Sequence, residues 1–370
     1  MEMMSLEECC EILDSMRIPI TASNRKEGIY PYYGANGIQD HVADYIFDDE
    51  LVLLAEDGGN FGSKTRPIAY RVSGKCWVNN HAHVLKPKEG LNVDFLCYSL
   101  MFYNTEGLVN GATRQKLTQT TMRKMLIPNL SIENQLYIVN QLNKLLKIIE
   151  LRKKEIQQLD NLTKARFVEL FGDENNSKNW DVVNIEEVAD VQVGVVIKPS
   201  QYYTDKSEGV RTFRSLNIGA GFIKDNDWVY FTKEGHQKNS KSILKKDDLL
   251  IVRSGAPGTA CVVTEEYAGC NAVDIIIAHP DCKKVNPYYL CTFTNMPHGK
   301  KQIDEGIGGA AQQHFNVGKY NKLQLMLPPK TLQDEFAGFI KQVDKSKVAV
   351  QKALDETQIL FDSLMQKYFG

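Results

Sequence analysis

The fold is decided by two long stretches: SIENQLYIVNQLNKLLKIIELRKKEIQQLDNLTKARFVELFG at 131–172 and TLQDEFAGFIKQVDKSKVAVQKALDETQILFDSLMQKYFG at 331–370. Neither contains proline, and each follows one, at Pro128 and at Pro328-Pro329. Steps of three and four residues alternate along each stretch, which is the spacing of a coiled-coil seam. The seam positions are Leu142, Leu145, Ile149, Arg152, Ile156, Leu159, Thr163, Arg166 and Leu170, and then Phe336, Ile340, Val343, Lys347, Val350, Leu354, Thr357, Phe361, Leu364 and Tyr368.

The residues before each stretch suit a helix N-cap: Ser131 followed by Asn134, and Thr331 followed by Asp334 and Glu335. The simplest partner for each helix is the other, in an antiparallel pair. The alternative is that each helix packs against its own globular domain. Periodicity sustained over about forty residues, or ~60 Å of helix, favours the pair.

Both stretches belong to an internal repeat with a period of just under 200 residues. Five short matches occur in the same order. They pair 49–54 with 247–252, 95–97 with 289–291, 111–112 with 309–310, 126–128 with 326–328, and 170–172 with 368–370. The chain is therefore read as two copies of one unit, which end at Gly172 and Gly370.

Each copy begins with short apolar runs, such as 51–54 and 275–278, which are bounded by turn residues and predict strands. The predicted fold is α+β with a pseudo-twofold internal repeat. It has two mixed α/β domains at 1–130 and 175–330, separated by two long antiparallel coiled-coil helices at 131–174 and 331–370.

The composition is that of an ordinary globular protein, with 370 residues, 43% hydrophobic and 24% charged. No apolar run approaches the length of a membrane span, and the acidic N-terminus does not resemble a signal peptide. We therefore expect a cytoplasmic protein whose 8 cysteines are reduced. The net charge of −2 argues against a nucleic-acid binder only if the charge is evenly distributed.

Catalytic and cofactor motifs are largely missing from the sequence. The segment 58–65 (GGNFGSKT) departs from the phosphate-loop spacing, and 306–311 (GIGGAA) lacks the context of a dinucleotide site. His81 and His83 could offer two metal ligands, but no further ligand motif accompanies them. Neither a serine-nucleophile elbow nor the tetrapeptide of adenine methyltransferases occurs. These observations favour a binding or scaffolding subunit over an enzyme.

Several segments resemble the DNA-specificity subunit of type I restriction-modification systems. In the first copy they are 32–37 (YYGANG), 53–58 (LLAEDG), 78–80 (VNN), 111–115 (GATRQ) and 127–128 (IP). In the second copy they are 250–255 (LIVRSG), 309–313 (GAAQQ) and 327–329 (LPP). The repeated order of domain, proline and long helix extends the resemblance over essentially the whole chain.

This resemblance implies that each domain is a target-recognition domain, which reads one half of a bipartite, asymmetric site in double-stranded DNA. The helices would set the gap between half-sites and dock modification subunits. Those partners bind S-adenosylmethionine and methylate adenine N6, and a restriction subunit that uses ATP and Mg can join them. The specificity subunit itself would bind no cofactor and perform no chemistry. The alternative is a two-domain coiled-coil scaffold that binds protein or RNA.

Two polar triplets lie at equivalent repeat positions in Gly-rich loops, so they are the first candidates for DNA contact, although solvated loops are the simpler interpretation. They are Arg114, Gln115 and Lys116, and Gln312, Gln313 and His314. Further candidates flank glycines or strand ends, where structural turns or solvated faces are the alternative. They are Tyr32, Tyr33, Asn36, Asn79, Asn80, His81, Arg211, Arg214, Asn217, Lys238, Lys241 and Arg253.

Overall fold

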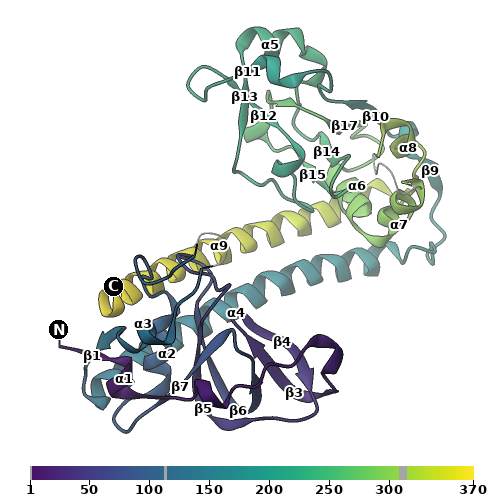
Figure 1. Ribbon diagram of the computed structural model, residues 1–370. Coiled ribbons are helices and arrows are strands. Elements are labelled where there is room, and N and C mark those ends of the chain that lie inside the picture. Colours follow the sequence, from purple (N-terminus) through teal and green to yellow (C-terminus); the bar gives the residue numbers. More distant parts are fainter. Residues whose placement is uncertain (1, 112–114, 308–314) are drawn as a thin grey trace. The chain divides into compact units, whose positions relative to one another are not determined.

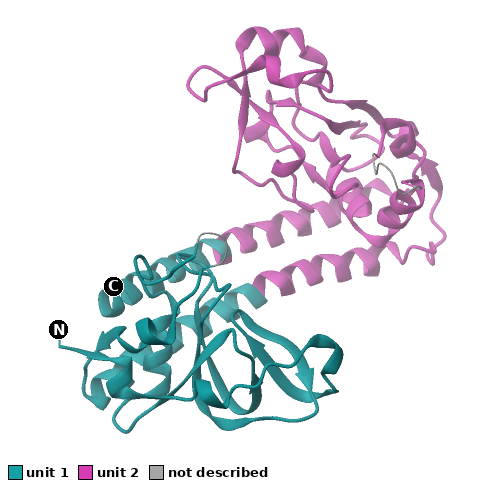
Figure 2. Ribbon diagram, in the orientation of Figure 1, with its two compact units in different colours: residues 1–154, 351–370 teal, residues 155–350 magenta. Residues whose placement is uncertain are grey.

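The computed structural model describes residues 2–111, 115–307 and 315–370. The chain divides into two compact units, one of residues 1–154 with 351–370 and the other of residues 155–350 (Figure 2). Two long helices, α4 (Ile132–Phe171) and α9 (Lys330–Phe369), contribute residues to both units (Figure 1). This is the predicted α+β fold, with two mixed domains and two long helices.

The first unit is built on a six-stranded sheet in the order β2-β7-β5-β6-β3-β4, and β1 pairs separately with β8. Its elements are β1 (Met3–Ser5), α1 (Leu6–Cys9), β2 (Cys10–Ile12), η1 (Asp14–Met16), η2 (Ala22–Asn24), β3 (Glu27–Gly34), β4 (Gly37–Val42), β5 (Phe47–Ala55), β6 (Ala69–Val78), β7 (Ala82–Pro87), α2 (Val93–Met101), α3 (Gln119–Arg123) and β8 (Leu126–Pro128). Residues 51–55 of β5 are all buried, as expected for a strand in the middle of a sheet.

The second unit has two four-stranded sheets, β10-β17-β14-β15 and β11-β13-β12-β16, and a pair formed by β18 and β9. Its elements are β9 (Val182–Asn184), η3 (Ile185–Glu187), β10 (Ala189–Val193), η4 (Pro199–Tyr202), β11 (Tyr203–Thr204), β12 (Val210–Phe213), η5 (Ser215–Asn217), β13 (Val229–Phe231), α5 (Lys233–Lys238), η6 (Ser240–Ser242), β14 (Leu249–Val252), β15 (Ala260–Val262), η7 (Glu265–Tyr267), β16 (Asn271–Ala272), β17 (Ile275–Pro280), α6 (Pro287–Asn295), α7 (Pro297–Gly306), α8 (Val317–Asn321) and β18 (Gln324–Met326).

The predicted repeat is visible in the strand order. The run β2-β7-β5-β6 in the first unit corresponds to β10-β17-β14-β15 in the second, and the pair β1-β8 corresponds to β9-β18. A buried glutamine at the start of each long helix repeats as well. The Gln135 side chain accepts a hydrogen bond from the backbone N–H of Asn92, and the Gln333 side chain accepts one from the backbone N–H of Asn286, both at 2.8 Å. The two copies therefore share one framework.

The seam of the long helices is as predicted, because all nineteen of its positions are buried or half-buried. In the first unit, Arg152 donates to the Ala353 carbonyl and the Thr357 hydroxyl. In the second unit, Lys347 Nζ lies 2.5 Å from an Asp160 carboxylate oxygen, and Arg166 Nη2 lies 2.7 Å from a Glu335 carboxylate oxygen.

Residues later in α4 therefore contact residues earlier in α9. This order shows that the two helices run antiparallel, as predicted.

The C-terminal end of each helix packs against the globular domain of the other copy. Phe171, at the end of α4, contacts Tyr289 and Phe336 with ring-centroid distances of 4.6 and 5.3 Å. Phe369, at the end of α9, contacts Phe95 at 5.3 Å. The alternative in which each helix packs only on its own domain is therefore wrong.

One of the two predicted N-caps is confirmed. The Ser131 hydroxyl accepts a hydrogen bond from the Asn134 amide at 3.4 Å. The prediction for Thr331 is wrong, because α9 already begins at Lys330. The Pro329 carbonyl accepts the first hydrogen bonds of the helix, from Leu332 at 3.0 Å and Gln333 at 3.2 Å, so Pro329 takes the cap position.

Seven of the eight cysteines are buried, and all eight are free thiols. Burial raises the pKa of Cys97 in α2, and that of Cys291 in α6, to about 12. These two thiols therefore serve as core side chains. Among the helices of the described residues, none combines the length and apolar character that crossing a bilayer requires.

Candidate nucleic-acid interface

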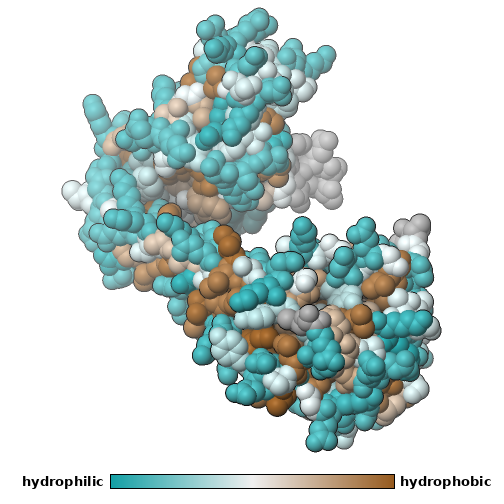
Figure 3. All heavy atoms as spheres, turned by 90° about the vertical axis from the view of Figure 1, so that its left-hand side faces the viewer, coloured by the Kyte–Doolittle hydropathy of each residue, from teal (hydrophilic) through white to brown (hydrophobic). Residues whose placement is uncertain are grey.

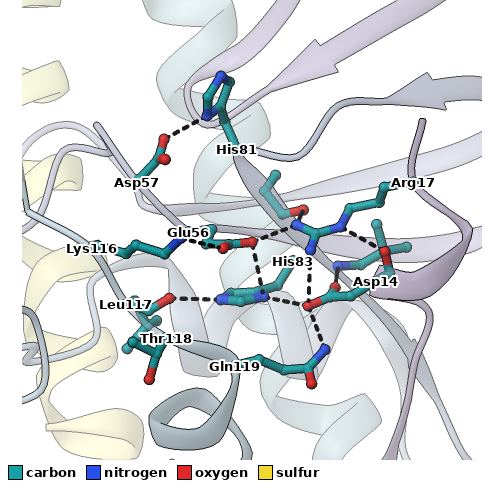
Figure 4. A network of polar contacts seen from close by, with 12 residues as sticks. Asp14, Arg17, Glu56, Asp57, His81, His83, Lys116, Leu117, Thr118 and Gln119 are labelled. Carbon is teal, nitrogen blue, oxygen red and sulfur yellow. Dashed lines mark hydrogen bonds and ion pairs between the residues drawn. The ribbon is translucent and has the colours of Figure 1, made fainter. Parts of the chain in front are cut away.

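Four of the predicted DNA-contact residues converge on one segment of the first unit, residues 56–58 after β5. The Asn36 amide donates to the Gly58 carbonyl at 3.0 Å, and the Gly58 N–H donates to the Gln115 carbonyl at 3.2 Å. His81 Nδ1 lies 2.7 Å from an Asp57 carboxylate oxygen, as Figure 4 shows. Lys116 Nζ lies 3.1 Å from a Glu56 carboxylate oxygen. Loops from distant parts of the sequence therefore meet at the end of β5.

Local sequence explains how these loops are placed. Residues 35–36 form the two-residue turn between β3 and β4, and Gly37 follows with φ +106°, which favours glycine. The Glu56 N–H donates to the His81 carbonyl at 2.9 Å, and the Leu117 N–H donates to the Glu56 carbonyl at 2.7 Å. Because Leu117 is fully buried, it fixes the segment that carries Gln115 and Lys116.

A charged network lies beneath this surface (Figure 4). Asp14 accepts hydrogen bonds from the Val84 amide and the Gln119 side chain, both at 2.9 Å, and lies 2.6 Å from His83 Nδ1. Burial raises the pKa of the Asp14 carboxyl, but the hydrogen bond and charge of His83, with the bonds from Val84 and Gln119, hold the pKa below its usual value. Asp14 is therefore an ionised, buried acceptor.

Asp14, Glu56 and His83 place ligand atoms within 4.8 Å of one another, the one such metal-compatible group among the described residues. The positive charge at this position is supplied by Arg17. Its guanidinium lies 2.6 Å from a Glu56 oxygen and 3.4 Å from an Asp14 oxygen. His81 and His83 face different carboxylates, Asp57 and Asp14. The geometry is thus that of a protein ion-pair network.

Three predicted contact residues are buried and have their polar groups engaged inside the chain. Tyr32 is 1% exposed, and its hydroxyl lies 3.2 Å from the Ile20 amide. Asn79 is 3% exposed and accepts from the His81 amide, while Asn217 is fully buried and accepts from the Arg214 amide. These side chains hold turns together, which favours the structural alternative for all three over DNA contact.

Tyr33 and Asn80 lie closer to the surface. Tyr33 is half-buried and stacks on Tyr70 with a centroid distance of 5.7 Å. Asn80 is exposed in the turn between β6 and β7, directly before His81. Asn80 is therefore available to a ligand at the same loops, whereas the Tyr33 ring supports the sheet.

In the second unit, Arg253 follows β14 as Glu56 follows β5. The Phe315 N–H donates to the Arg253 carbonyl at 3.0 Å, which repeats the contact of Leu117 with Glu56. The Arg253 guanidinium donates to the Phe315 carbonyl at 3.3 Å and to the Asp274 carboxylate at 2.5 Å. Its side chain is 17% exposed. The Arg253 side chain is therefore engaged by Phe315 and Asp274.

The other candidates of the second unit lie at separate places. The Arg211 guanidinium lies over the ring of Trp228 at 5.1 Å, and Arg214 pairs with Asp227 at 3.2 Å. Lys238 in α5 lies over the Tyr202 ring at 5.9 Å, and Lys241 in η6 is exposed. The contacts of the described residues do not join these cations to Arg253. The remaining candidates, Arg114, Gln312, Gln313 and His314, lie outside the described residues.

Lys64 and Arg66 were missed by sequence reasoning. Both are exposed on the connection from β5 to β6, which starts with residues 56–58. Their signal was present, because a Gly-rich segment with basic side chains is typical of a phosphate contact.

Comparisons with known proteins agree with this organisation. The type I restriction modification DNA specificity domain family matches the chain twice, at 1–161 and 177–357. A type I restriction enzyme specificity subunit of Haemophilus influenzae is 29% identical to this chain, and the match covers 94% of this chain and 89% of that protein. The MjaVIII specificity subunit of Methanocaldococcus jannaschii is 22% identical over 95% of this chain and 89% of its own.

Solved structures show the same fold. The S subunit of a type I restriction-modification system from M. genitalium superposes with a TM-score of 0.61 at 15% identity, over 100% of this chain and 96% of that one. A chain from a structure on complex assembly and conformational transition of the type I system gives 0.57 at 15% identity, over 100% and 97%. The chain therefore belongs to the family of non-catalytic DNA-specificity subunits of type I restriction-modification systems.

Proposed function

We propose that this chain reads a bipartite, asymmetric site in double-stranded DNA, with one globular domain on each half. The observation that carries the proposal is the repeated framework β2-β7-β5-β6 and β10-β17-β14-β15, to which each copy attaches different strands. A shared framework presents both domains in the same way, whereas different loops read different bases. The half-sites therefore need not be related by symmetry.

The loops around residues 56–58 suit direct readout by the first domain. Asn36, Asn80, Gln115 and Lys116 are exposed, and amide and amino groups distinguish base edges in the major groove. Lys64 and Arg66 on the adjoining connection supply charge for the phosphates. Glu56 and Asp57 would repel DNA if they were bare, but Lys116 and His81 cover them.

The long helices are proposed to set the gap between half-sites. Each of α4 and α9 has 40 residues, which corresponds to ~60 Å of helix. One turn of duplex spans ~34–36 Å. A helix of this length can therefore connect domains that engage half-sites about one turn apart.

The same helices are proposed to dock the modification subunits. Large apolar side chains on α4 and α9 are exposed, including Tyr137, Leu151, Leu162, Val348 and Ile359. Figure 3 shows hydrophobic patches on an otherwise mostly hydrophilic surface. Exposed apolar groups that cluster are typical of protein interfaces.

The docked subunits are proposed to bind S-adenosylmethionine and to methylate an adenine N6 after flipping the base out of the duplex. A restriction subunit that uses ATP and Mg would join the same assembly, and the complex would act in the cytoplasm against phage DNA. With a net charge of −2, the isolated chain should bind DNA weakly and gain affinity on assembly.

The experiment is to co-express the chain with an adenine methyltransferase subunit and to map methylated adenines by sequencing. The expected result is one bipartite motif with two unrelated halves at a fixed gap. Methylation without sequence preference, together with binding of RNA or another protein, would instead support the scaffold. A matched culture that lacks this chain controls for methylation by the host.

A further inference from the structure

We infer that His83, with Asp14 and Glu56, is a buried positioning site that sets the base specificity of the first domain without touching DNA. The inference rests on the proposed function and adds to it a residue that sequence reasoning considered only as a metal ligand. The site lies under residues 115–119, which carry the exposed side chains of Gln115 and Lys116.

The His83 ring is fully buried between two oxygen acceptors. Its Nδ1 lies 2.6 Å from Asp14 Oδ2, and its Nε2 lies 2.9 Å from the Leu117 carbonyl oxygen (Figure 4). A carbonyl oxygen can only accept, so Nε2 carries a hydrogen. Asp14 also accepts from the Val84 backbone N–H and the Gln119 side chain, so one carboxyl group holds the ring, β7 and the start of α3 together.

His83 therefore joins η1 to the loop through both of its ring nitrogens. Charged side chains from the segments packed around the ring face it. They are Asp14 in η1, Arg17 after it, Glu56 after β5 at 3.7 Å from Nδ1, and Lys116 on the loop through Glu56. The two carboxylates pair with Arg17, Lys116 and the His83 ring, so the network is rigid.

Three residues of the loop are tied to this network in succession. The Lys116 ammonium pairs with Glu56, the Leu117 carbonyl accepts from His83, and the Gln119 amide donates to Asp14. Base recognition requires side chains to be held near their productive geometry by supporting contacts. Loosening His83 should therefore displace Gln115 and Lys116 together, although both remain present.

The second unit supplies a matched control. His279 also pairs with a buried aspartate, Asp248, at 2.6 Å. Its other nitrogen faces the Gln192 side chain at 2.8 Å. Among the described residues, His279 thus reproduces the histidine–aspartate pair with a glutamine side chain as the second partner of the ring.

The test compares His83→Gln and His279→Gln in the assembled methyltransferase complex. A glutamine at 83 carries both of its N–H donors on one nitrogen, whereas the imidazole presents a separate ring nitrogen to each acceptor. We expect His83→Gln to relax base preference in one half of the motif and to lower the methylation rate at the original site by 10-fold or more, with the other half unchanged. We expect His279→Gln to retain the full motif. A folded His83→Gln complex with an unaltered motif and rate would overturn the inference.

If His83→Gln fails to fold, Gln119→Ala is the second test, because Gln119 is exposed and its side chain hydrogen-bonds Asp14, its side-chain partner among the described residues. We expect about a threefold loss that affects the same half-site, with an unchanged melting temperature. An unaltered motif and rate in Gln119→Ala would overturn the inference. Should the wild-type complex itself show no motif, the proposed function fails rather than the role of His83.

Discussion

The two globular domains share a framework but carry opposite charges at the residue that follows the equivalent strands β5 and β14. In the first, the Glu56 carbonyl accepts a hydrogen bond from the Leu117 N–H, and the Glu56 carboxylate pairs with Arg17 and Lys116. In the second, the Arg253 carbonyl accepts a hydrogen bond from the Phe315 N–H, and the Arg253 guanidinium pairs with Asp274. The backbone contact is therefore retained while the charge at the same position is reversed.

The strands next to the shared framework differ as well. In the first domain β3 and β4 extend the main sheet to six strands, whereas in the second β11, β12 and β13 belong to a separate sheet with β16. Even so, β3 pairs in parallel with the end of β6, and β12 pairs in parallel with β16. The comparison indicates that a common core carries diverged reading surfaces.

The largest expected effect tests how the helix ends hold the two domains. Phe171 is fully buried against Tyr289 and Phe336, whereas Phe369 is half-buried against Phe95. Phe171→Ala should lower the free energy of unfolding by ~3–5 kcal/mol, the usual cost of truncating a buried phenylalanine. Phe369→Ala should cost clearly less. Chemical denaturation measures both, and equal losses would show that the two helix ends are equivalent.

Substitutions in the two polar triplets should affect recognition of different half-sites. Arg114→Ala and Gln313→Ala each alter one of the two equivalent polar triplets, and each lost base contact should cost ~1–3 kcal/mol of discrimination. Methylation sequencing should show a relaxed base in one half for the first variant and in the other half for the second. If both variants relaxed the same half, the assignment of one domain to each half would be wrong.

Equivalent substitutions in the shared framework should lower the free energy of unfolding by similar amounts in both copies. Gln135 and Gln333 are fully buried, and each donates to backbone carbonyls in addition to accepting one amide bond. Replacing either with alanine strands buried polar groups, which costs ~1–3 kcal/mol. Denaturation of the two alanine variants should give similar losses. Gln358→Ala, on an exposed part of α9, is the control and should change little.

The smallest effect concerns pH. The pKa of Asp14 lies below its usual value, so its contribution to stability is present above the unfolded pKa of ~3.9 and is lost as pH falls through the folded value. In the second unit, burial raises the pKa of Asp344, with Lys347 opposing and Asp160 adding to the rise. Its ionised form therefore weakens the fold above the raised pKa, and this penalty disappears on acidification.

Consequently, Asp14→Asn should destabilise the protein at neutral pH, and Asp344→Asn should stabilise it. Both differences from wild type should shrink toward pH ~3. Unfolding midpoints measured across this pH range provide the check. Differences that stayed constant with pH would contradict the two pKa directions.

Sequence reasoning reached the features that depend on periodicity. Seam positions such as Leu142 and Phe361 are buried because the three-four spacing reflects local helix geometry. The repeat likewise anticipated that β5 and β14 are equivalent.

Features that depend on distant contacts were not reached. Tyr32, Asn79 and Asn217 have the composition of exposed turns, yet they are buried by partners far along the chain or across a turn. The convergence of Asn36, His81 and Gln115 requires the sheet order, which no local pattern encodes. The role of His83 depends on Asp14 and Leu117, which are 69 and 34 residues away from it.

The most direct test of the central claim is to remove one heptad of seven residues from the middle of both α4 and α9 and to map the methylated motif. Matched deletions preserve the seam and shorten each helix by ~10 Å. At ~3.4 Å per base pair, the account predicts unchanged half-site sequences with a gap about three base pairs shorter. A motif with its original gap would contradict it.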